Sequence, residues 1–318
     1  MAKVLITGIA GFIGSSIARE LLAQGATIVG VDNLSTGRME NLEEILSSIE
    51  FRRADVQDAQ AMDDACVDVD YVFHEAAIPS VPKSVQDPVG TNGPNLDGTL
   101  TLLEAARKAG VKRLMYAASS AAYGDAPELP KTEAMLPAPI SPYAVQKVAG
   151  EHYLSSYARV YGLETVSLRY FNIFGPRQDP TSQYSGVLAR FISQMTAGET
   201  PTIFGDGQTS RDFTYIDNVV SANLLAAKAP SSVSGKIFNV ATGRRVTLLE
   251  AYQAIKKIVG YTGDIQFKPE REGDIKHSVA DISLAQQMLG YRVVADFTYG
   301  LEMTIEWSKG VQSMTAIA

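Results

Sequence analysis

The chain has 318 residues, 46% of them hydrophobic and 20% charged, as expected of a globular protein with a sizeable core. Its net charge of −7 argues against a general nucleic-acid-binding protein, and its single cysteine, Cys66, excludes an internal disulfide or a cysteine-rich metal site. No apolar run approaches the roughly 20 residues that a membrane helix needs. The first residues enter a strand pattern directly, without the features of a signal peptide, so we expect a cytoplasmic protein with no membrane partner.

Short β-rich runs alternate with helical patterns through the first half of the chain. The expected strands are Lys3–Thr7, Thr27–Val31, Phe51–Ala54, Tyr71–His74, Arg113–Ala118 and Thr165–Arg169. The expected helices are Phe12–Ala23, Thr99–Ala109 and Pro142–Tyr161, and a glycine closes each of the last two. Strands that alternate with helices predict parallel βαβ units and therefore a doubly wound α/β sheet.

The pattern loosens after about Phe174, where prolines and the turn Gly205-Asp206-Gly207 interrupt it. We expect residues 1–173 to form the first domain and residues 174–318 to form mainly a smaller α/β lobe that closes over a ligand. The segments Phe213–Ala227 and Ile237–Ala241 could return to the first domain.

Three glycines follow the first strand and open the first helix. Gly8, Gly11 and Gly14 are spaced three residues apart, and glycines at such a junction permit a tight turn and close approach of the backbone to a pyrophosphate. Asp32 ends the second strand, where a carboxylate accepts hydrogen bonds from a ribose 2′-hydroxyl and repels a 2′-phosphate. The pattern predicts a dinucleotide site that prefers NAD to NADP, although Arg38 nearby weakens that preference.

Tyr143 and Lys147 lie one turn apart at the start of the predicted helix Pro142–Tyr161. A tyrosine has a pKa of about 10, which is too high for a base near neutral pH. A lysine ammonium beside it, together with the positive charge of an oxidised nicotinamide, would favour the phenolate and lower its pKa. Ser119 follows the strand Arg113–Ala118 and can donate its hydroxyl to the same substrate oxygen. The three residues therefore predict a site that oxidises a hydroxyl group, whereas Tyr143 and Lys147 alone would be read as a solvated surface pair.

A longer ordered set of motifs runs along nearly the whole chain. It comprises Thr7-Gly8-x-x-Gly11-Phe12-Ile13-Gly14, Asp32-Asn33, Asp55-Val56, His74-x-Ala76-Ala77, Asn95-x-x-Gly98-Thr99, Ser119-Ser120-x-x-Tyr123-Gly124, Ser141-Pro142-Tyr143-x-x-x-Lys147, Arg169-Tyr170-Phe171-Asn172, Ser210-Arg211-Asp212-Phe213 and Arg271-x-Gly273-Asp274. In this set the chain resembles the extended short-chain dehydrogenase/reductases, and among them the 4-epimerases of UDP-hexoses and UDP-N-acetylhexosamines. The resemblance implies a Rossmann fold, NAD as cofactor and a 4-keto sugar intermediate.

The same resemblance implies a role for individual residues: Tyr143 as the base, Lys147 as its electrostatic partner and Ser119 as the anchor of the substrate hydroxyl. The implied cofactor-binding residues are Gly8, Gly11, Phe12, Ile13, Gly14, Asp32, Asn33, Asp55, Val56, Ala76, Ala77, Asn95, Tyr143 and Lys147. The implied substrate-binding residues are Ser80, Ser119, Ser120, Tyr143, Asn172, Gln178, Gly186, Val187, Arg211, Arg271, Asp274 and Ser278.

The substrate-binding residues favour a UDP-sugar. Arg211 and Arg271 match the family's pyrophosphate-binding arginines, and guanidinium groups suit phosphate oxygens because they form paired hydrogen bonds. Ser278 and Gly186 are small and leave room for an N-acetyl group. We therefore expect epimerisation of UDP-GlcNAc/UDP-GalNAc, of UDP-Glc/UDP-Gal, or of both.

Related enzymes of the same family and a non-catalytic protein are alternatives to an epimerase. Related 4,6-dehydratases and UDP-glucuronate decarboxylases carry a carboxylate just after the catalytic serine or threonine, where this chain has Ser120-Ala121. A UDP-glucuronate 4-epimerase remains open, as does a non-catalytic NAD-binding sensor. The family implies a homodimer in which two long helices of each subunit pair. No metal is expected, because the histidines lack metal-ligand spacing, and His74 is expected to be a buried, hydrogen-bonded group.

Overall fold

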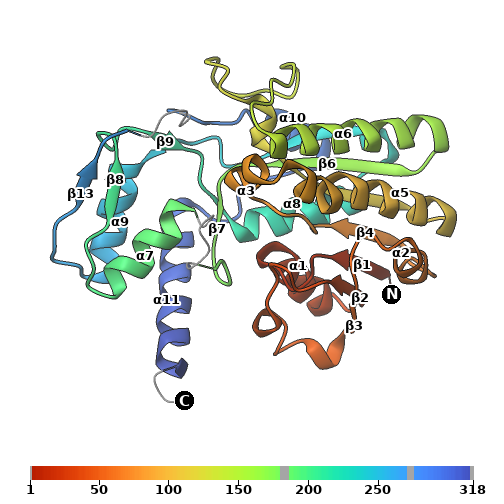
Figure 1. Ribbon diagram of the computed structural model, residues 1–318, viewed down its shortest axis with the longest axis horizontal. Coiled ribbons are helices and arrows are strands. Elements are labelled where there is room, and N and C mark those ends of the chain that lie inside the picture. Colours follow the sequence, from red (N-terminus) through yellow and green to blue (C-terminus); the bar gives the residue numbers. More distant parts are fainter. Residues whose placement is uncertain (1, 180–185, 271–275, 316–318) are drawn as a thin grey trace.

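The computed structural model describes residues 2–179, 186–270 and 276–315, with side chains described up to residue 310. Two regions lie side by side (Figure 1). The larger region contains a seven-stranded parallel sheet with helices on both faces, and the smaller one contains short strand pairs and helices. Across the described ranges, none of the helices has the length and apolar character required to span a membrane.

The large sheet has the strand order β11-β6-β5-β4-β1-β2-β3, and all its neighbouring strands are parallel. Its strands are β1 (Lys3–Thr7), β2 (Thr27–Asp32), β3 (Glu50–Arg53), β4 (Tyr71–His74), β5 (Arg113–Ser119), β6 (Glu164–Tyr170) and β11 (Lys236–Val240). The order 3-2-1-4-5-6 is that of a doubly wound dinucleotide-binding sheet, to which β11 adds a seventh strand. The predicted α/β fold class is confirmed.

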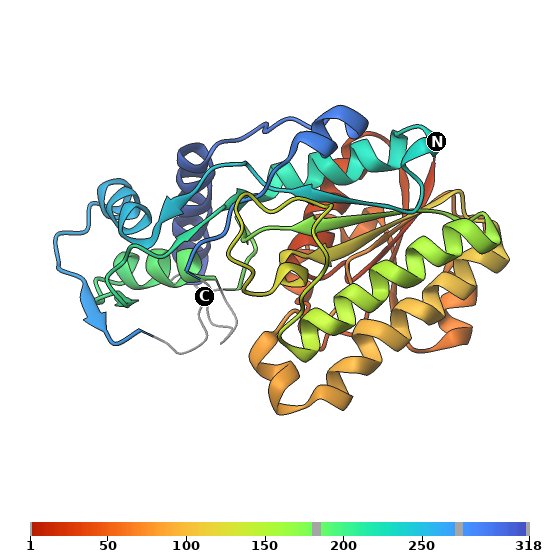
Figure 2. The same ribbon diagram turned by 90° about the horizontal axis from the view of Figure 1, so that it is seen from above.

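Helices cover both faces of this sheet (Figure 2). One face carries α1 (Phe12–Ala23) and α8 (Ile216–Lys228), and the other carries α2 (Ala59–Ala65), α5 (Gly98–Ala109) and α6 (Pro142–Tyr161). Successive side chains of a strand point to opposite faces, so Val4 and Ile6 join the core under α1 and α8, while Leu5 joins the core under α5. Both faces of the sheet are covered by the apolar core, which explains the continuous apolar runs that predicted these strands.

Local signals in the sequence set the limits of α6, the helix that carries Tyr143 and Lys147. The Ala144 N–H donates to the side chain of the N-cap residue Ser141 at 3.2 Å, and Pro142 occupies the first turn. Gly162 ends the helix with φ of 72°, a left-handed conformation that glycine adopts without strain. The predicted bounds of α6, α1, β1 and β4 match the observed ones, and the other predicted elements differ by one residue at one end or at both.

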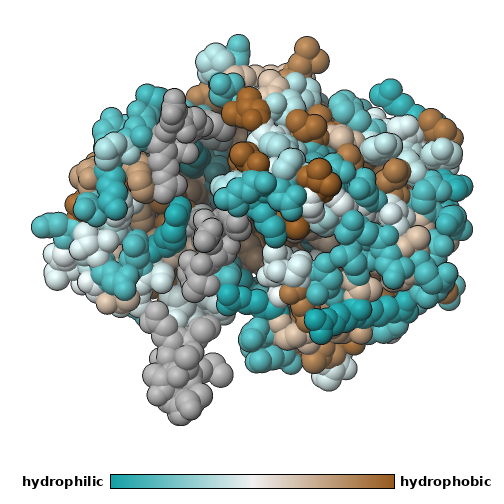
Figure 3. Space-filling model, viewed as in Figure 1, coloured by the Kyte–Doolittle hydropathy of each residue, from teal (hydrophilic) through white to brown (hydrophobic). Residues whose placement is uncertain are grey.

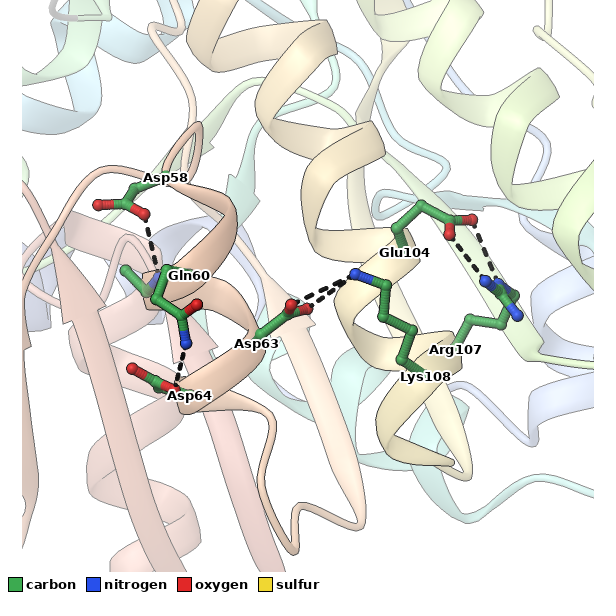
Figure 4. Close-up of polar contacts among 8 residues, drawn as sticks. Asp58, Gln60, Asp63, Asp64, Glu104, Arg107 and Lys108 are labelled. Carbon is green, nitrogen blue, oxygen red and sulfur yellow. Dashed lines mark hydrogen bonds and ion pairs between the residues drawn. The ribbon is translucent and has the colours of Figure 1, made fainter.

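Polar contacts tie the outer surfaces of α2 and α5 together (Figure 4). Lys108 on α5 lies 3.3 Å from a carboxylate oxygen of Asp63 on α2, and Arg107 pairs with Glu104 one turn away at 2.9 Å. These side chains are exposed, so each pair contributes at most about 1 kcal/mol. The apolar core beneath them, which includes Met62, therefore dominates the packing of the two helices.

The smaller region is built from short pieces. Its helices are α7 (Val187–Thr196), α9 (Leu248–Val259) and α11 (Phe297–Thr315), and its strand pairs are β8 (Thr202–Phe204) with β13 (Gln266–Lys268) and β9 (Ser210–Arg211) with β12 (Val246–Thr247). Connecting elements are β7 (Ile173–Phe174), β10 (Thr214–Tyr215) and α10 (Ser283–Leu289), whereas α3 (Val81–Gln86) and α4 (Pro88–Asn92) belong to the sheet region, where both pack on α6. Each strand pair joins segments well separated in the chain.

Two segments of the second half return to the large sheet. Helix α8 packs on α1 and on β5 and β6, and β11 pairs with β6 along its whole length. These are the segments that the sequence pattern left open between the two parts. Their return means that the smaller region is held to the sheet at several points of the chain.

Candidate active site

A cavity of about 1120 Å³ lies at the carboxyl ends of the large sheet's strands and extends to the smaller region. Figure 3 shows the surface hollowed between the two regions. Open α/β sheets bind ligands at this edge. Most of the predicted site residues line it, namely Gly8, Gly11, Phe12, Ile13, Gly14, Asp32, Asn33, Val56, Ala76, Ala77, Ser80, Ser119, Ser120, Tyr143, Lys147, Asn172, Gln178, Gly186, Arg211 and Ser278.

The remaining predicted residues lie elsewhere. Arg271 and Asp274 fall outside the described residues. Val187 lines a second cavity of about 460 Å³, whose wall also includes Gly186 and Arg211. The second cavity therefore adjoins the first where both meet Gly186 and Arg211.

Asp55 and Asn95 lie just behind the wall of the larger cavity. The side-chain amide of Asn33 donates to Asp55 Oδ2 at 2.7 Å. The buried Asn95 accepts the Ile78 N–H at 2.7 Å and donates to Gln146 Oε1 on α6 at 2.8 Å. Both side chains thus hold residues of the wall, Asn33 and Ile78, in place.

The turn between β1 and α1 leaves no space for side chains. Gly8 has φ of +71°, and a Cβ there would lie 2.7 Å from the backbone nitrogen of Ala76. A Cβ on Gly14 would lie 2.3 Å from the carbonyl oxygen of Gly8. No side chain caps the N-terminus of α1, which begins after Gly11 and faces the cavity. A bare backbone cradle at a positive helix end fits the pyrophosphate of a dinucleotide.

Asp32 fixes the far side of this cradle. Its Oδ2 accepts the Ala10 N–H at 2.9 Å, and its Oδ1 accepts the Leu34 N–H at 2.8 Å. Burial raises the pKa of Asp32, and the two backbone hydrogen bonds oppose that rise. Gly37 also belongs to this arrangement, because a Cβ there would lie 2.8 Å from both Asp32 oxygens, and sequence reasoning missed it. Arg38 pairs with Asp179 at 2.5 Å.

Tyr143 and Ser119 come together in the cavity from α6 and from the end of β5. The Tyr143 N–H donates to Ser84 Oγ at 3.0 Å, which fixes the first turn of α6 against α3. Burial raises the pKa of the Tyr143 phenol, and a hydrogen bond with the Ser119 side chain opposes the rise. Ser119 and Tyr143 therefore face the same part of the cavity.

In the protein without a nucleotide, burial raises the pKa of Tyr143 and Lys147 is not among the groups that act on it, so the expected combined effect of Lys147 and an oxidised nicotinamide stays a prediction. The Lys147 ammonium instead donates to the Ala117 carbonyl oxygen at 2.8 Å and lies 4.8 Å from the centre of the Tyr116 ring. Burial lowers the pKa of Lys147 to about 8, with Glu75 and Glu151 opposing the change. The i, i+4 spacing placed both residues on one helix face, but the carbonyl at the end of β5 decides where the ammonium points.

Sequence reasoning also missed two residues of the cavity wall, Glu75 and Tyr170. The Tyr170 hydroxyl donates to Glu75 Oε1 at 3.0 Å, and Asn223 Nδ2 donates to the Tyr170 oxygen at 2.8 Å. Burial raises the pKa of Glu75 to about 7. The available signal was a carboxylate directly after the apolar strand β4, a position where charge is unusual.

His74, the last residue of β4, is buried as predicted. Its Nδ1 lies 2.7 Å from Thr7 Oγ1, and its Nε2 lies 2.9 Å from Thr99 Oγ1. Burial lowers the pKa of His74 to about 3, and the nearby charge of Lys147 acts in the same direction. His74 is therefore neutral near pH 7 and ties β1, β4 and α5 together.

The substrate end of the cavity is assembled from distant parts of the chain. The Ser278 N–H donates to the Ser210 carbonyl oxygen at 3.1 Å, and the neighbouring Arg211 guanidinium donates to the Lys276 carbonyl oxygen at 3.2 Å. The buried Asp212 carboxylate binds two further segments of the chain, since it accepts the N–H groups of Thr242 and Ala280 at 2.9 and 3.2 Å.

Asn172 and Gln178 connect this end to the sheet. Asn172 has φ of 35° and donates from Nδ2 to the Asp212 carbonyl oxygen at 3.3 Å. Gln178 donates to the Ile173 carbonyl oxygen at 3.2 Å. Ser80 is buried at the opposite wall and caps α3 by accepting the Lys83 N–H at 3.0 Å.

The strand order, the glycine cradle and the grouping of Ser119, Tyr143 and Lys147 define an extended short-chain dehydrogenase/reductase. The chain matches the NAD dependent epimerase/dehydratase family over residues 4–241. It belongs to that family and, within it, to the nucleotide-sugar 4-epimerases. The predictions of family, enzyme class and NAD as cofactor are confirmed.

Individual relatives differ in the sugar that they are named for. A UDP-glucose 4-epimerase of Mycolicibacterium smegmatis is 40% identical over 96% of this chain and 98% of its own length. The structure of a UDP-N-acetylglucosamine 4-epimerase of Methanobrevibacter ruminantium, in complex with UDP-N-acetylmuramic acid, superimposes with a TM-score of 0.93 at 39% identity, covering 98% and 99% of the chains. A UDP-glucuronic acid 4-epimerase of Bacillus cereus, with UDP-glucuronic acid and NAD, gives 0.88 at 32% identity, covering 97% and 99%.

Proposed function

We propose that this protein interconverts the C4 epimers of a UDP-sugar through a 4-keto sugar, with UDP-GlcNAc/UDP-GalNAc, UDP-Glc/UDP-Gal or both as substrates. The observation that carries the proposal is one continuous cavity. It contains the glycine cradle at one end, Arg211 and Ser278 at the other, and the side chains of Ser119 and Tyr143 between them.

Each side chain of the cavity has its own role in the proposed reaction. Ser119 holds the sugar O4, and Tyr143 removes the O4 proton and later returns it. The glycine cradle and Asp32 would hold NAD, which would supply the acceptor and then the donor of the C4 hydride, and the charge of its oxidised nicotinamide would favour the Tyr143 phenolate. Lys147 keeps a protonated ammonium under the same site. Arg211 meets the diphosphate, because a guanidinium forms paired bonds with phosphate oxygens.

The smaller side chains of the cavity support an N-acetylated sugar. Ser278 and Gly186 both line the wall, and among the described residues a Cβ added to Gly186 would meet Gln178 Nε2, at 3.8 Å. The relatives named for UDP-glucose and for UDP-N-acetylglucosamine match this chain with similar identity. Both substrate pairs therefore belong to the proposal.

UDP-glucuronate is the second candidate sugar, because the Bacillus cereus structure covers nearly the whole chain. A dehydratase or decarboxylase fits less well. Ser120 and Ala121 begin the 3₁₀ turn Ser120–Tyr123 that follows β5, and neither can act as an acid on a leaving group.

The direct test uses the purified protein with three substrates supplied separately: UDP-glucose, UDP-N-acetylglucosamine and UDP-glucuronate. We expect the C4 epimer from at least one of the first two, and NAD rather than NADP in the nucleotide released on denaturation. Conversion of UDP-glucuronate alone would replace the proposed sugar. Bound NAD without turnover of any sugar would favour a non-catalytic sensor.

We also propose a cytoplasmic homodimer. Helix α6 exposes Val145, Tyr153, Val160 and Tyr161, and exposed apolar side chains on a long helix suit a subunit interface. Light scattering on the eluting protein gives the oligomeric state, and a mass of one chain would contradict the dimer.

A further inference from the structure

The floor of the cavity holds a carboxylate that the proposed reaction does not use. Glu75 directly follows β4, Tyr170 ends β6, and Lys147 lies on the second turn of α6, and all three side chains line the cavity. Because β4, β5 and β6 are neighbours in the sheet, their carboxyl ends bring these groups to one place.

Glu75 is held firmly through one of its two oxygens. The Tyr170 hydroxyl donates to Oε1 at 3.0 Å, and Asn223 orients Tyr170 by donating to its oxygen at 2.8 Å while also bonding the Val219 carbonyl oxygen at 3.0 Å. Within the described part of the chain, the other oxygen, Oε2, is buried without a hydrogen-bond partner. A buried carboxylate oxygen left in this way is costly, so it requires a compensating charge.

Lys147 is the cation available to supply that charge. Its side chain is 2% exposed, and its ammonium has three N–H groups, of which one donates to the Ala117 carbonyl oxygen. The other carboxylate close to it, Glu151, is engaged by Arg169 through two hydrogen bonds of 2.8 and 2.7 Å. Glu75 is thus the nearby carboxylate that Arg169 does not neutralise.

We propose that Glu75 is a positioning residue for Lys147: its buried carboxylate, held by Tyr170, which Asn223 orients, keeps the Lys147 ammonium protonated under the reaction site. The inference rests on the proposed function and deepens it, because it explains how a lysine in a dry site stays charged. Without an opposing charge, burial alone favours neutral lysine.

The other titratable groups around Glu75 and Lys147 do not supply an alternative charge. His74 on β4 is neutral near pH 7, since burial lowers its pKa to about 3. Tyr116 on β5, Tyr143 on α6 and Tyr170 on β6 have pKa values raised by burial and carry no charge there. The pKa of Lys147 is lowered to about 8 and that of Glu75 raised to about 7, so the two groups titrate as a coupled pair around neutral pH.

The first test measures Lys147 itself and needs no turnover. The side-chain nitrogen of Lys147 is titrated by NMR in protein labelled with ¹⁵N-lysine, in the wild type and in Glu75→Gln. We expect the variant to lower the pKa of Lys147 by about one unit, the lower end of the range for loss of a nearby opposite charge. Glu133→Gln is the matched control, because Glu133 is also a carboxylate with a pKa raised by burial, and its Oε1 accepts the Asn239 N–H at 2.7 Å.

The second test uses the hydrogen bond to Glu75. In the wild type, the hydrogen bond from the Tyr170 hydroxyl lowers the pKa of Glu75. Tyr170→Phe removes this bond, so the pKa of Glu75 should rise in the variant. The acidic limb of the turnover profile should then move to higher pH. Glu75→Asp should restore part of the Lys147 shift, whereas a purely structural role would leave the titration of Lys147 unchanged in every variant.

The outcomes separate this inference from the proposed function. An unchanged Lys147 titration in Glu75→Gln, with thermal unfolding showing a folded protein, overturns the inference and leaves the epimerase assignment standing. If the Lys147 titration shifts in Glu75→Gln but the wild-type protein converts no UDP-sugar, the action of Glu75 on Lys147 is supported and the proposed epimerase function is overturned. If Glu75→Gln does not fold, an unmoved acidic limb in Tyr170→Phe overturns the inference.

Discussion

The sheet region and the smaller region place their cavity residues by different means. In the first, the residues follow strand ends directly: Gly8 follows β1, Asp32 ends β2 and Ser119 ends β5. In the second, Ser210 meets His277 and Arg211 meets Lys276 across more than 60 residues of chain. Because the first arrangement is local and the second depends on long-range pairing, substitutions should affect chemistry and cofactor retention in the first region and sugar choice in the second.

The largest effect is expected at Tyr143. Tyr143→Phe removes the group proposed to move the O4 proton, so turnover should fall by roughly 10²- to 10⁴-fold with substrate binding largely kept. Tyr153→Phe on the exposed face of the same helix is the control. The measurement is the initial rate and the UDP-sugar affinity of both variants. Near-wild-type turnover in Tyr143→Phe would remove Tyr143 from the mechanism.

The glycine cradle offers the next largest effect. Gly14→Ala puts a Cβ 2.3 Å from the Gly8 carbonyl oxygen, and backbone atoms cannot rotate away as a side chain would. Overpacking of this kind costs about 1–3 kcal/mol or more, so NAD affinity should fall by roughly ten- to a hundredfold. Gly310→Ala, where an added Cβ meets nothing within 4 Å, should retain the nucleotide. Equal amounts of NAD released from the two variants would contradict the proposed cradle.

Ser278 tests the smaller region. Ser278→Tyr adds a ring where the wild-type wall is small, while the backbone bond to Ser210 and the Ser119–Tyr143 pair are untouched. An N-acetyl group would overlap the ring, so kcat/KM for UDP-N-acetylglucosamine should fall by roughly tenfold to a hundredfold relative to that for UDP-glucose. The ratio cancels general damage to the fold. Equal losses on both sugars would make Ser278 a packing residue only.

The smallest effect is on stability. The pKa of His74 is lowered from 6.5 to about 3 in the folded protein, so its neutral form is favoured by folding. Its contribution to stability is complete above pH 6.5 and is lost as pH falls toward 3, at up to roughly 1.4 kcal/mol per pH unit. Urea unfolding at pH 7, 6 and 5 should show a shallower loss in His74→Gln than in the wild type. Parallel curves would assign the acid sensitivity to other groups.

Much of the sheet region could be predicted from the sequence. The strands β1 and β4 and the helices α1 and α6 have their predicted bounds, because apolar runs, caps and closing glycines act within a few residues. The glycine turn and Asp32 were found for the same reason, since a tight turn and a strand end are local features. The short strands β8, β9, β12 and β13 were not predicted individually, because pairs of two or three residues carry almost no periodicity.

What only the tertiary structure decided is which side chains meet. The sequence placed Tyr143 and Lys147 on one helix face, but only the packed structure shows that the ammonium donates to the Ala117 carbonyl oxygen on β5 and that burial raises the pKa of Tyr143. The hydrogen bond from Tyr170 to Glu75, and that from Asn223 to Tyr170, join two strand ends and a helix that lie far apart in the chain. Periodicity and turn chemistry are fixed by neighbouring residues, whereas hydrogen-bond partners and burial depend on how strands and helices pack, and a single sequence does not contain that geometry.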